Sequence, residues 1–132
     1  MGAAENKKLI QDAFAAWASG NGGAFFALLA DDVRWTVIGT SPVSRTYTSK
    51  NGFLEGAAKP LNAKLAGPIQ PTVRNVIAEG DTVVLQWDGK ATSKAGKPYN
   101  NSYCWVMKIA NDKVIEGTAY IDTELVSELW KS

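Results

Sequence analysis

The pattern of hydrophobic and polar positions divides the chain into a mostly helical first half and a strand-forming second half. Over residues 5–18, apolar side chains recur at helical spacing with charged and polar side chains opposite them, which predicts an amphipathic helix. The glycine-rich segment 19–23 ends this helix, because glycine supplies the left-handed conformation common at helix C-termini. The pattern then predicts a short helix at 24–30, a strand at 33–38 and a loop at 39–49. A helix follows at 51–59; Pro60 limits it, although Leu61 and Leu65 leave open that helical character continues further.

From Ile69 onward the apolar positions alternate, as is typical of strands. The predicted elements are strands at 71–79 and 82–92, a long hairpin at 99–122 that turns at 111–112, and a short terminal helix or extension. Gly89 and Gly117 are expected to bend these long strands. Three helices and one early strand followed by four antiparallel strands form an α+β pattern, with the helices on one side of a sheet.

The hairpin at 99–122 holds the most distinctive side chains. Because side chains on a strand alternate between faces, its first strand carries one row with three aromatic members: Tyr99, Asn101, Tyr103, Trp105, Met107 and Ile109. Its second strand separates Ile115, Gly117, Ala119 and Ile121 from Val114, Glu116, Thr118, Tyr120 and Asp122. We expect the rest of the chain to close over this hairpin and form a pocket.

Length, charge and hydrophobicity limit the classes of protein to which this chain could belong. A length of 132 residues fits one domain that spans residues 1–132. The net charge of +1, with no basic run longer than Lys7-Lys8, argues against nucleic acid and anionic membranes as partners. No segment approaches the roughly 20 apolar residues of a membrane span. The amphipathic start does not resemble a signal peptide, so we expect a cytoplasmic protein.

The histidine and cysteine content of the chain restricts which catalytic systems and metal sites it can form. The sequence contains no histidine, which excludes catalytic systems that depend on histidine and zinc sites that histidine ligates. Cys104 is the only cysteine, so neither an internal disulfide nor a thiolate metal cluster can form. We therefore expect no metal and no organic cofactor. Acid–base chemistry would have to come from Asp, Glu, Tyr, Lys, Arg or the single thiol.

Longer segments resemble a known family. ADDVRWTVIGTSP and, after a helix, VIAEGDTVVLQWDGKATSKAGKPYNNSYCWVMKIANDKVIEGTAYIDTELV are similar to the SnoaL-like, ketosteroid-isomerase-related branch of the NTF2-like superfamily. This resemblance covers nearly the whole chain. It implies a cone in which a strongly curved mixed or antiparallel sheet wraps around three helices and encloses a pocket. Because the superfold hosts isomerases, dehydratases, cyclases, epoxide hydrolases and binding proteins, function must be argued from the site.

The resemblance also implies a homodimer that forms through the convex face of the sheet. Val83, Leu85 and Trp87 share one parity, and we expect them to face outward on that surface. Burial between two subunits would cover apolar strands that otherwise favour aggregation.

The residues of the known ketosteroid isomerases are not retained. Those enzymes use an Asp base with a Tyr and a protonated Asp as hydrogen-bond donors. Alignment on the ADD, MKI and AY landmarks places the Tyr donor at Ala13, the base at Val37 and the Asp donor at Trp105. Steroid isomerisation by that mechanism is therefore not expected.

The remaining candidates for a site centre on Asp122. A carboxyl among Trp and Tyr side chains resists ionisation and can act as an acid or base near neutral pH. Alternatively, Asp122 is the N-cap of a helix in TELVSEL, and the alignment directs Ile121 into the pocket instead. Arg45 is a candidate contact for an anionic group. The expected pocket lining is Phe14, Trp17, Trp35, Val37, Tyr47, Phe53, Tyr103, Trp105, Met107 and Ile121.

Two functional hypotheses follow. The first is an enzyme without cofactors that acts on an apolar, oxygenated small molecule by isomerisation, hydration or ring chemistry. The second is a non-catalytic protein that binds a small apolar ligand or serves as a dimeric scaffold. An Asp or Tyr hydroxyl that points into the pocket favours the first hypothesis, and an entirely apolar lining favours the second.

Overall fold

The computed structural model describes residues 2–131. Its elements are α1 (Ala3–Ala18), the 3₁₀ turn η1 (Phe26–Leu28), β1 (Leu29–Val37), β2 (Arg45–Tyr47), α2 (Lys50–Phe53), the π-helical turn η2 (Leu54–Ala58), α3 (Lys59–Ala63), β3 (Gln70–Glu79), β4 (Thr82–Thr92), β5 (Pro98–Ala110), β6 (Lys113–Ile121) and α4 (Thr123–Lys131).

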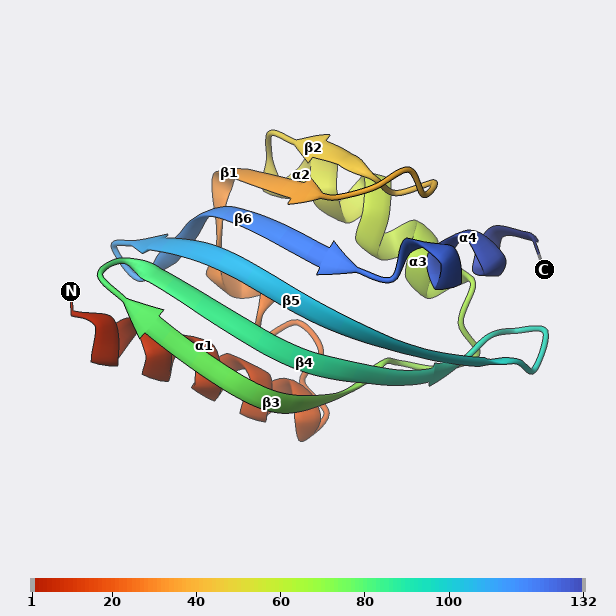
Figure 1. Ribbon diagram of the computed structural model, residues 1–132, viewed down its shortest axis with the longest axis horizontal. Coiled ribbons are helices and arrows are strands. Elements are labelled where there is room, and N and C mark those ends of the chain that lie inside the picture. The colour runs from red at the N-terminus through yellow and green to blue at the C-terminus, as the bar shows by residue number, and fades with distance from the viewer. Residues whose placement is uncertain (1, 132) are drawn as a thin grey trace.

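The strands of the described chain form one six-stranded sheet in the order β2-β1-β6-β5-β4-β3. β1 runs parallel to β6, and the other neighbouring pairs are antiparallel. The turn between β5 and β6 lies at Asn111 and Asp112, whose φ angles of 51° and 61° are the left-handed values that a two-residue hairpin requires. The predicted hairpin is therefore confirmed. The long strands β3 to β6 curve together across the molecule (Figure 1).

The helices cover one face of this curved sheet. α1 lies along β3 and β4, while α2 lies beside β1 and β2 (Figure 1). Phe14 of α1 contacts Trp87, and Phe53 of α2 contacts Trp35. Trp35 and Trp87 both contact Trp105, so the helices share one face of the sheet. The predicted α+β class, with a mixed, curved sheet and helices on one side, is confirmed. No helix within residues 2–131 has the length and apolar character needed to cross a membrane.

The predicted helix at 24–30 is wrong in extent. Only the single turn η1 forms, and the following strand begins at Leu29, four residues earlier than expected. Asp31 and Asp32 lie exposed within β1, between the buried Leu29 and Val33. The pairing of β1 with β6 shifts register after Leu29. This irregularity accommodates the two acids inside β1, between the segments predicted as helix 24–30 and strand 33–38.

Two further boundaries differ from the prediction. The expected loop at 39–49 contains β2, which pairs with the end of β1. The helix expected at 51–59 continues through Pro60 as far as Ala63, which is the extension that Leu61 and Leu65 left open. In a regular α-helix the Pro60 ring would collide with the carbonyl of Gly56, one turn earlier. The wider π-helical turn η2 contains Gly56 and provides space for the ring.

The outward orientation predicted for Val83, Leu85 and Trp87 is wrong. These side chains are 0%, 0% and 1% exposed, and they face the helices. Alternate residues of β4, among them Val84 and Gln86, face outward instead. Trp87 is buried because it packs between Phe14 of α1 and the stacked ring of Tyr103.

The side chains of the second hairpin strand also differ from simple alternation at one position. Val114 pairs with Ile109, whereas Glu116 pairs with Lys108, so Ile115 is an extra residue in a bulge. Ile115 is consequently 36% exposed, while Val114 is fully buried. Beyond the bulge, Gly117 and Ala119 are buried as part of one row.

Gly117 has a more specific role than a bend. It pairs with Trp35 on the neighbouring strand and with Met107 on the other side. A Cβ atom at position 117 would overlap Cζ3 and Cε3 of the Trp35 indole. The absence of a side chain at Gly117 therefore lets Trp35 lie against the sheet.

We predict that Gly117→Ala destabilises the protein. Strand propensity alone would favour alanine, whereas overlap with Trp35 should cost about 1–3 kcal/mol in the free energy of unfolding. For a domain of this length, that cost lowers Tm by about 3–12 °C in thermal denaturation. Gly67→Ala is the matched control, because a Cβ at Gly67 meets no atom within 4 Å. Equal Tm values for Gly117→Ala and the wild type would contradict this role.

Candidate functional site

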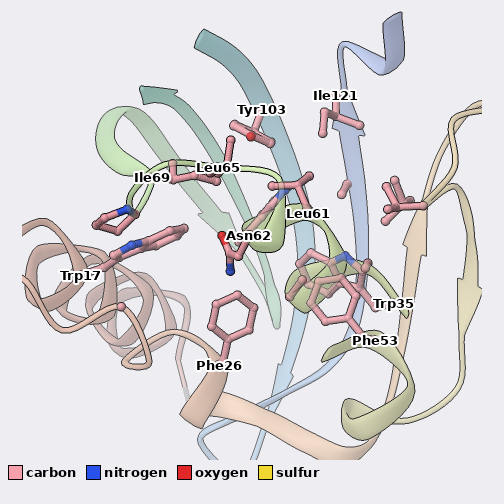
Figure 2. Close-up of a pocket in the computed structure, with 18 of the residues that line it drawn as sticks. Trp17, Phe26, Trp35, Phe53, Leu61, Asn62, Leu65, Ile69, Tyr103 and Ile121 are labelled. Atoms are coloured by element: carbon pink, nitrogen blue, oxygen red, sulfur yellow. The ribbon is translucent and has the colours of Figure 1, made fainter. Parts of the chain in front are cut away.

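A cavity of about 470 Å³ lies between the inner face of the sheet and the helical segment α2–η2–α3 (Figure 2). Strands β1, β4, β5 and β6 provide its deep wall, and α1, α3 and the segment before β3 contribute to its rim. Its lining consists of Trp17, Gly22, Phe26, Trp35, Val37, Val43, Phe53, Ala57, Ala58, Leu61, Asn62, Leu65, Gly67, Pro68, Ile69, Trp87, Tyr103, Trp105, Ala119 and Ile121.

Aromatic rings from several strands form the deep wall. Trp105 of β5 makes edge-to-face contacts with Trp35 of β1 and with Trp87 of β4, both at 5.0 Å between ring centroids. Phe53 of α2 lies 5.2 Å from Trp35, across from the sheet. Tyr103 stacks on Trp87 at 4.0 Å with an interplanar angle of 10°. These contacts hold the rings in fixed orientations, so the wall is a preformed apolar surface.

Charged side chains do not contribute to this cavity. Among the described residues that line it, none is Asp, Glu, Lys or Arg. The polar side-chain groups of the lining are the Asn62 carboxamide, the Tyr103 hydroxyl and the indole N–H groups of the tryptophans. The indole nitrogens of Trp87 and Trp105 are buried and have no hydrogen-bond partner within residues 2–131. A charged ligand would therefore lose its hydration without gaining a counter-ion.

Tyr103 belongs to a short chain of buried hydrogen bonds. Its hydroxyl donates to the Tyr99 hydroxyl at 3.4 Å, and Asn101 Nδ2 donates to the same Tyr99 oxygen at 3.0 Å. The Asn101 amide also bonds the backbone of Asp122, with Nδ2 donating to its carbonyl at 3.1 Å and Oδ1 accepting from its N–H at 3.2 Å. Asn101 thus ties the end of β6 to β5 and fixes the position of the two phenols.

Burial keeps both phenols protonated. Desolvation raises the pKa of Tyr103 well above the ordinary phenol value, and the neighbouring Tyr99, to which Tyr103 donates, raises it further. Burial also raises the pKa of Tyr99, although the hydrogen bonds from Tyr103 and Asn101 oppose that shift. At neutral pH the Tyr103 hydroxyl can therefore serve as a neutral hydrogen-bonding group, and it cannot act as a general base.

Most of the expected lining residues come together in the cavity: Trp17, Trp35, Val37, Phe53, Tyr103, Trp105 and Ile121. Three others lie outside it. Phe14 packs behind the wall, 5.2 Å from Trp87, and Met107 is 1% exposed within the core. The Tyr47 hydroxyl donates to the Val43 carbonyl at 2.7 Å and so supports a lining residue from behind.

Asp122 lies outside the cavity lining, next to Ile121, which is part of it. Its side chain is exposed, and Oδ1 accepts hydrogen bonds from the N–H groups of Glu124 and Leu125 at 3.0 and 3.3 Å. These are the contacts of a helix N-cap at the start of α4. The contacts of Asp122 are thus those of the helix N-cap that the sequence analysis gave as the alternative to catalysis. No contact between Asp122 and the cavity supports a catalytic role.

Arg45 is also outside the lining. It is an exposed residue of β2, and its guanidinium carbon lies 5.2 Å from the centroid of the Tyr47 ring. This is the geometry of a cation–π contact. No group of three or more His, Cys, Asp or Glu side chains among residues 2–131 is arranged to hold a metal ion.

The sequence analysis missed part of the rim and one residue of the wall. Trp87 was assigned to the wrong face of β4, although Val83, Leu85 and Trp87 form the more apolar row of that strand. Ala58, Leu61 and Leu65 recur at helical spacing, which left open that the helix continues past Pro60, but they were not expected to line the cavity. Nothing in the pattern distinguishes Asn62, because the rotation of α3 about its axis determines where this side chain points.

Comparison with known proteins identifies related folds. A model of the SnoaL-like domain matches residues 10–117. An NTF2-like protein from Burkholderia thailandensis is 21% identical, covers 96% of this chain and 98% of its own, and superposes with a TM-score of 0.79. Bal32a, from a soil-derived mobile gene cassette, is 20% identical, with coverages of 97% and 98% and a TM-score of 0.80.

A third similar structure is TerC, which was co-crystallised with polyporic acid. It is 22% identical, with coverages of 96% and 98% and a TM-score of 0.77. A comparison of the sequence with curated proteins gave no match. The structural similarities confirm the NTF2-like fold that the sequence predicted.

We predict that Tyr103 makes the stability of the protein sensitive to alkaline pH. Because its pKa is raised in the folded state, its contribution to stability is complete below about pH 10 and is lost as the pH rises through the folded-state pKa. Thermal denaturation at pH 9 and pH 11 should show a smaller loss of stability in Tyr103→Phe than in the wild type. Tyr120→Phe, which removes a phenol that is 48% exposed, is the matched control. Identical losses in Tyr103→Phe and the wild type would contradict the burial of this hydroxyl.

Proposed function

The chain belongs to the SnoaL-like domain family, and we propose that it binds a neutral, largely apolar small molecule in the aromatic cavity. The observation that carries this proposal is an apolar cavity of about 470 Å³ without a charged side chain in its described lining. That volume lies within the roughly 300–1,000 Å³ of typical small-molecule sites. Apolar surface that a ligand removes from water there contributes about 25 cal/mol per Å² to binding.

The shape of the wall supports a flat ligand. The edge-to-face contacts of Trp105 with Trp35 and Trp87 leave ring faces and edges along the cavity. Aromatic pairs prefer offset-stacked or edge-to-face arrangements, and a planar unsaturated ring can form both with such a wall. The co-crystallisation of TerC with polyporic acid is consistent with small-molecule binding in this fold, while the identity of 22% relates the two proteins by fold alone.

A second candidate function is turnover of the bound molecule without a cofactor. The Tyr103 hydroxyl favours it, because it lines the cavity and would donate to a carbonyl oxygen of the ligand if its proton turned away from Tyr99. Such donation polarises a carbonyl, but isomerisation, hydration or ring chemistry also needs a group that takes up a proton. The described lining contains no carboxylate for that role, so binding is the function that the geometry supports best.

We also propose a homodimer that forms through the outer face of the sheet. The outward residues differ from those expected from the sequence. Ile77, Val84 and Val106 pair across three neighbouring strands and form an apolar row on that face, with Ile77 55% exposed. Tyr120, opposite Cys104 on the same face, is 48% exposed. A second copy of the chain would remove this apolar surface from water.

We predict that filling the cavity weakens binding of a neutral apolar probe. N-phenyl-1-naphthylamine should bind the wild type with increased fluorescence. Ala58→Trp places a large side chain in the lining of the cavity and should weaken binding at least about tenfold, or about 1.4 kcal/mol. Ala63→Trp is the matched control, because Ala63 is exposed on α3 and lies outside the lining. Equal affinity in Ala58→Trp and the wild type, or no binding to either, would refute the proposal.

We predict a particle of twice the chain mass of 14.2 kDa in light scattering of the wild type. Val106→Lys introduces a charge into the apolar row on the outer face and should shift the particle to a single chain, because an unpaired charge is costly to bury. Circular dichroism that matches the wild type would show that the variant is folded. A wild-type particle of 14.2 kDa would rule out the homodimer.

A further inference from the structure

Asn62 is the one carboxamide in the lining of the cavity within the described chain. It belongs to α3, at the rim, and is exposed to solvent in the absence of a ligand. Figure 2 shows its side-chain oxygen and nitrogen directed into the space between Trp17, Phe26 and Phe53, all of which also line the cavity. A polar group thus projects into the entrance of an otherwise apolar site.

The backbone that carries Asn62 is held in place by its neighbours. The Asn62 carbonyl accepts a hydrogen bond from the N–H of Leu65 at 3.1 Å, which closes a turn at the end of α3. Lys64, in the same turn, places its ammonium 5.4 Å from the centroid of the Trp130 ring in α4. Leu65 is buried and forms an isolated bridge with Ser93. The segment that carries Asn62 is therefore anchored on both α4 and the strand ladder.

The solvation of the Asn62 amide makes this side chain favour ligands with an oxygen atom over hydrocarbons. In the free protein its amide can bond water, so it carries no penalty while the cavity is empty. A ligand that extends to the entrance and covers the amide removes this water, and an amide left without a partner costs free energy comparable to a lost hydrogen bond. A molecule with an oxygen at that point offsets the loss, whereas a hydrocarbon of the same shape does not.

We propose that Asn62 selects ligands that carry a carbonyl or hydroxyl oxygen at the end that faces the cavity entrance. Asn62 Nδ2 can donate a hydrogen bond to a carbonyl oxygen of the ligand, and Oδ1 can accept one from a hydroxyl of the ligand. The same side chain can therefore bind either group. An amide also carries no net charge, in keeping with the uncharged lining. This inference rests on the proposed binding function, since it assigns the polar end of the same ligand.

The experiment compares molecules of one shape that differ only in this group. Equilibrium binding of tetralin, 1-tetralone and 1-tetralol to the wild type is measured by quenching of tryptophan fluorescence. We expect 1-tetralone and 1-tetralol to bind the wild type about three- to tenfold more tightly than tetralin, the effect of one neutral hydrogen bond. In Asn62→Leu this preference should disappear, with tetralin binding retained or strengthened.

Asn62→Asp separates donor from acceptor. A carboxylate only accepts hydrogen bonds, so binding of 1-tetralone should fall about three- to tenfold while binding of 1-tetralol is retained. Ala63→Leu is the matched control, because it places an apolar side chain on the same helix outside the lining and should leave all three affinities unchanged.

The possible outcomes separate this inference from the function on which it rests. An unchanged preference for the oxygenated molecules in Asn62→Leu would overturn the role of Asn62 and leave the binding function intact. Equal affinity of the wild type for all three molecules would do the same. Failure of the wild type to bind any of them would overturn the binding function, and the inference with it.

Discussion

The packing of Trp105 is the interaction on which the rest of the structure depends. Its indole contacts aromatic rings from α1, β1, β4, β5 and the segment before η1: Phe14, Phe25, Trp35, Trp87 and Tyr103. Segments far apart in the sequence meet at this residue. Such contacts are geometrically specific and together bury a large apolar area. They join the inner face of the sheet to α1, and Trp35, Trp87, Tyr103 and Trp105 also form the wall of the cavity.

Close packing of these large rings requires small residues at defined positions. Gly117 leaves space for Trp35, and a Cβ at Gly89 would lie 2.8 Å from Ile69 and 3.0 Å from Tyr103. The same rings that fill the core leave one region open, because α3 and the segment before β3 lie across the rim without filling it. An uncharged lining with hydrogen-bonding groups at a few points favours recognition of a neutral molecule by shape and by one or two oxygens.

Family membership and site chemistry give different information here. The SnoaL-like domain and the similar structures account for the fold, while the alignment of sequence landmarks places Ala13, Val37 and Trp105 where ketosteroid isomerases would have their catalytic residues. Val37 and Trp105 line the cavity, so apolar side chains occupy two places where those enzymes have acids. An apolar side chain cannot take up or donate a proton at those positions. This apolar lining is consistent with the proposed binding of a neutral molecule.

The sequence by itself determined the α+β class, the order of most elements, the hairpin at Asn111 and Asp112, and much of the aromatic wall. These features could be predicted because alternation and helical spacing are local properties of the chain. The more apolar row of β4 also indicated that Trp87 faces inward, but the expected dimer surface reversed that assignment. Tertiary structure decided the bulge at Ile115 and the continuation of the helix past Pro60. Asp122 lies outside the cavity because of how the end of β6 is oriented against the core. Asn62 lies at the cavity entrance because of how α3 is rotated about its axis. Contacts between segments distant in the sequence determine these orientations, so the pattern of residues along the chain does not predict them.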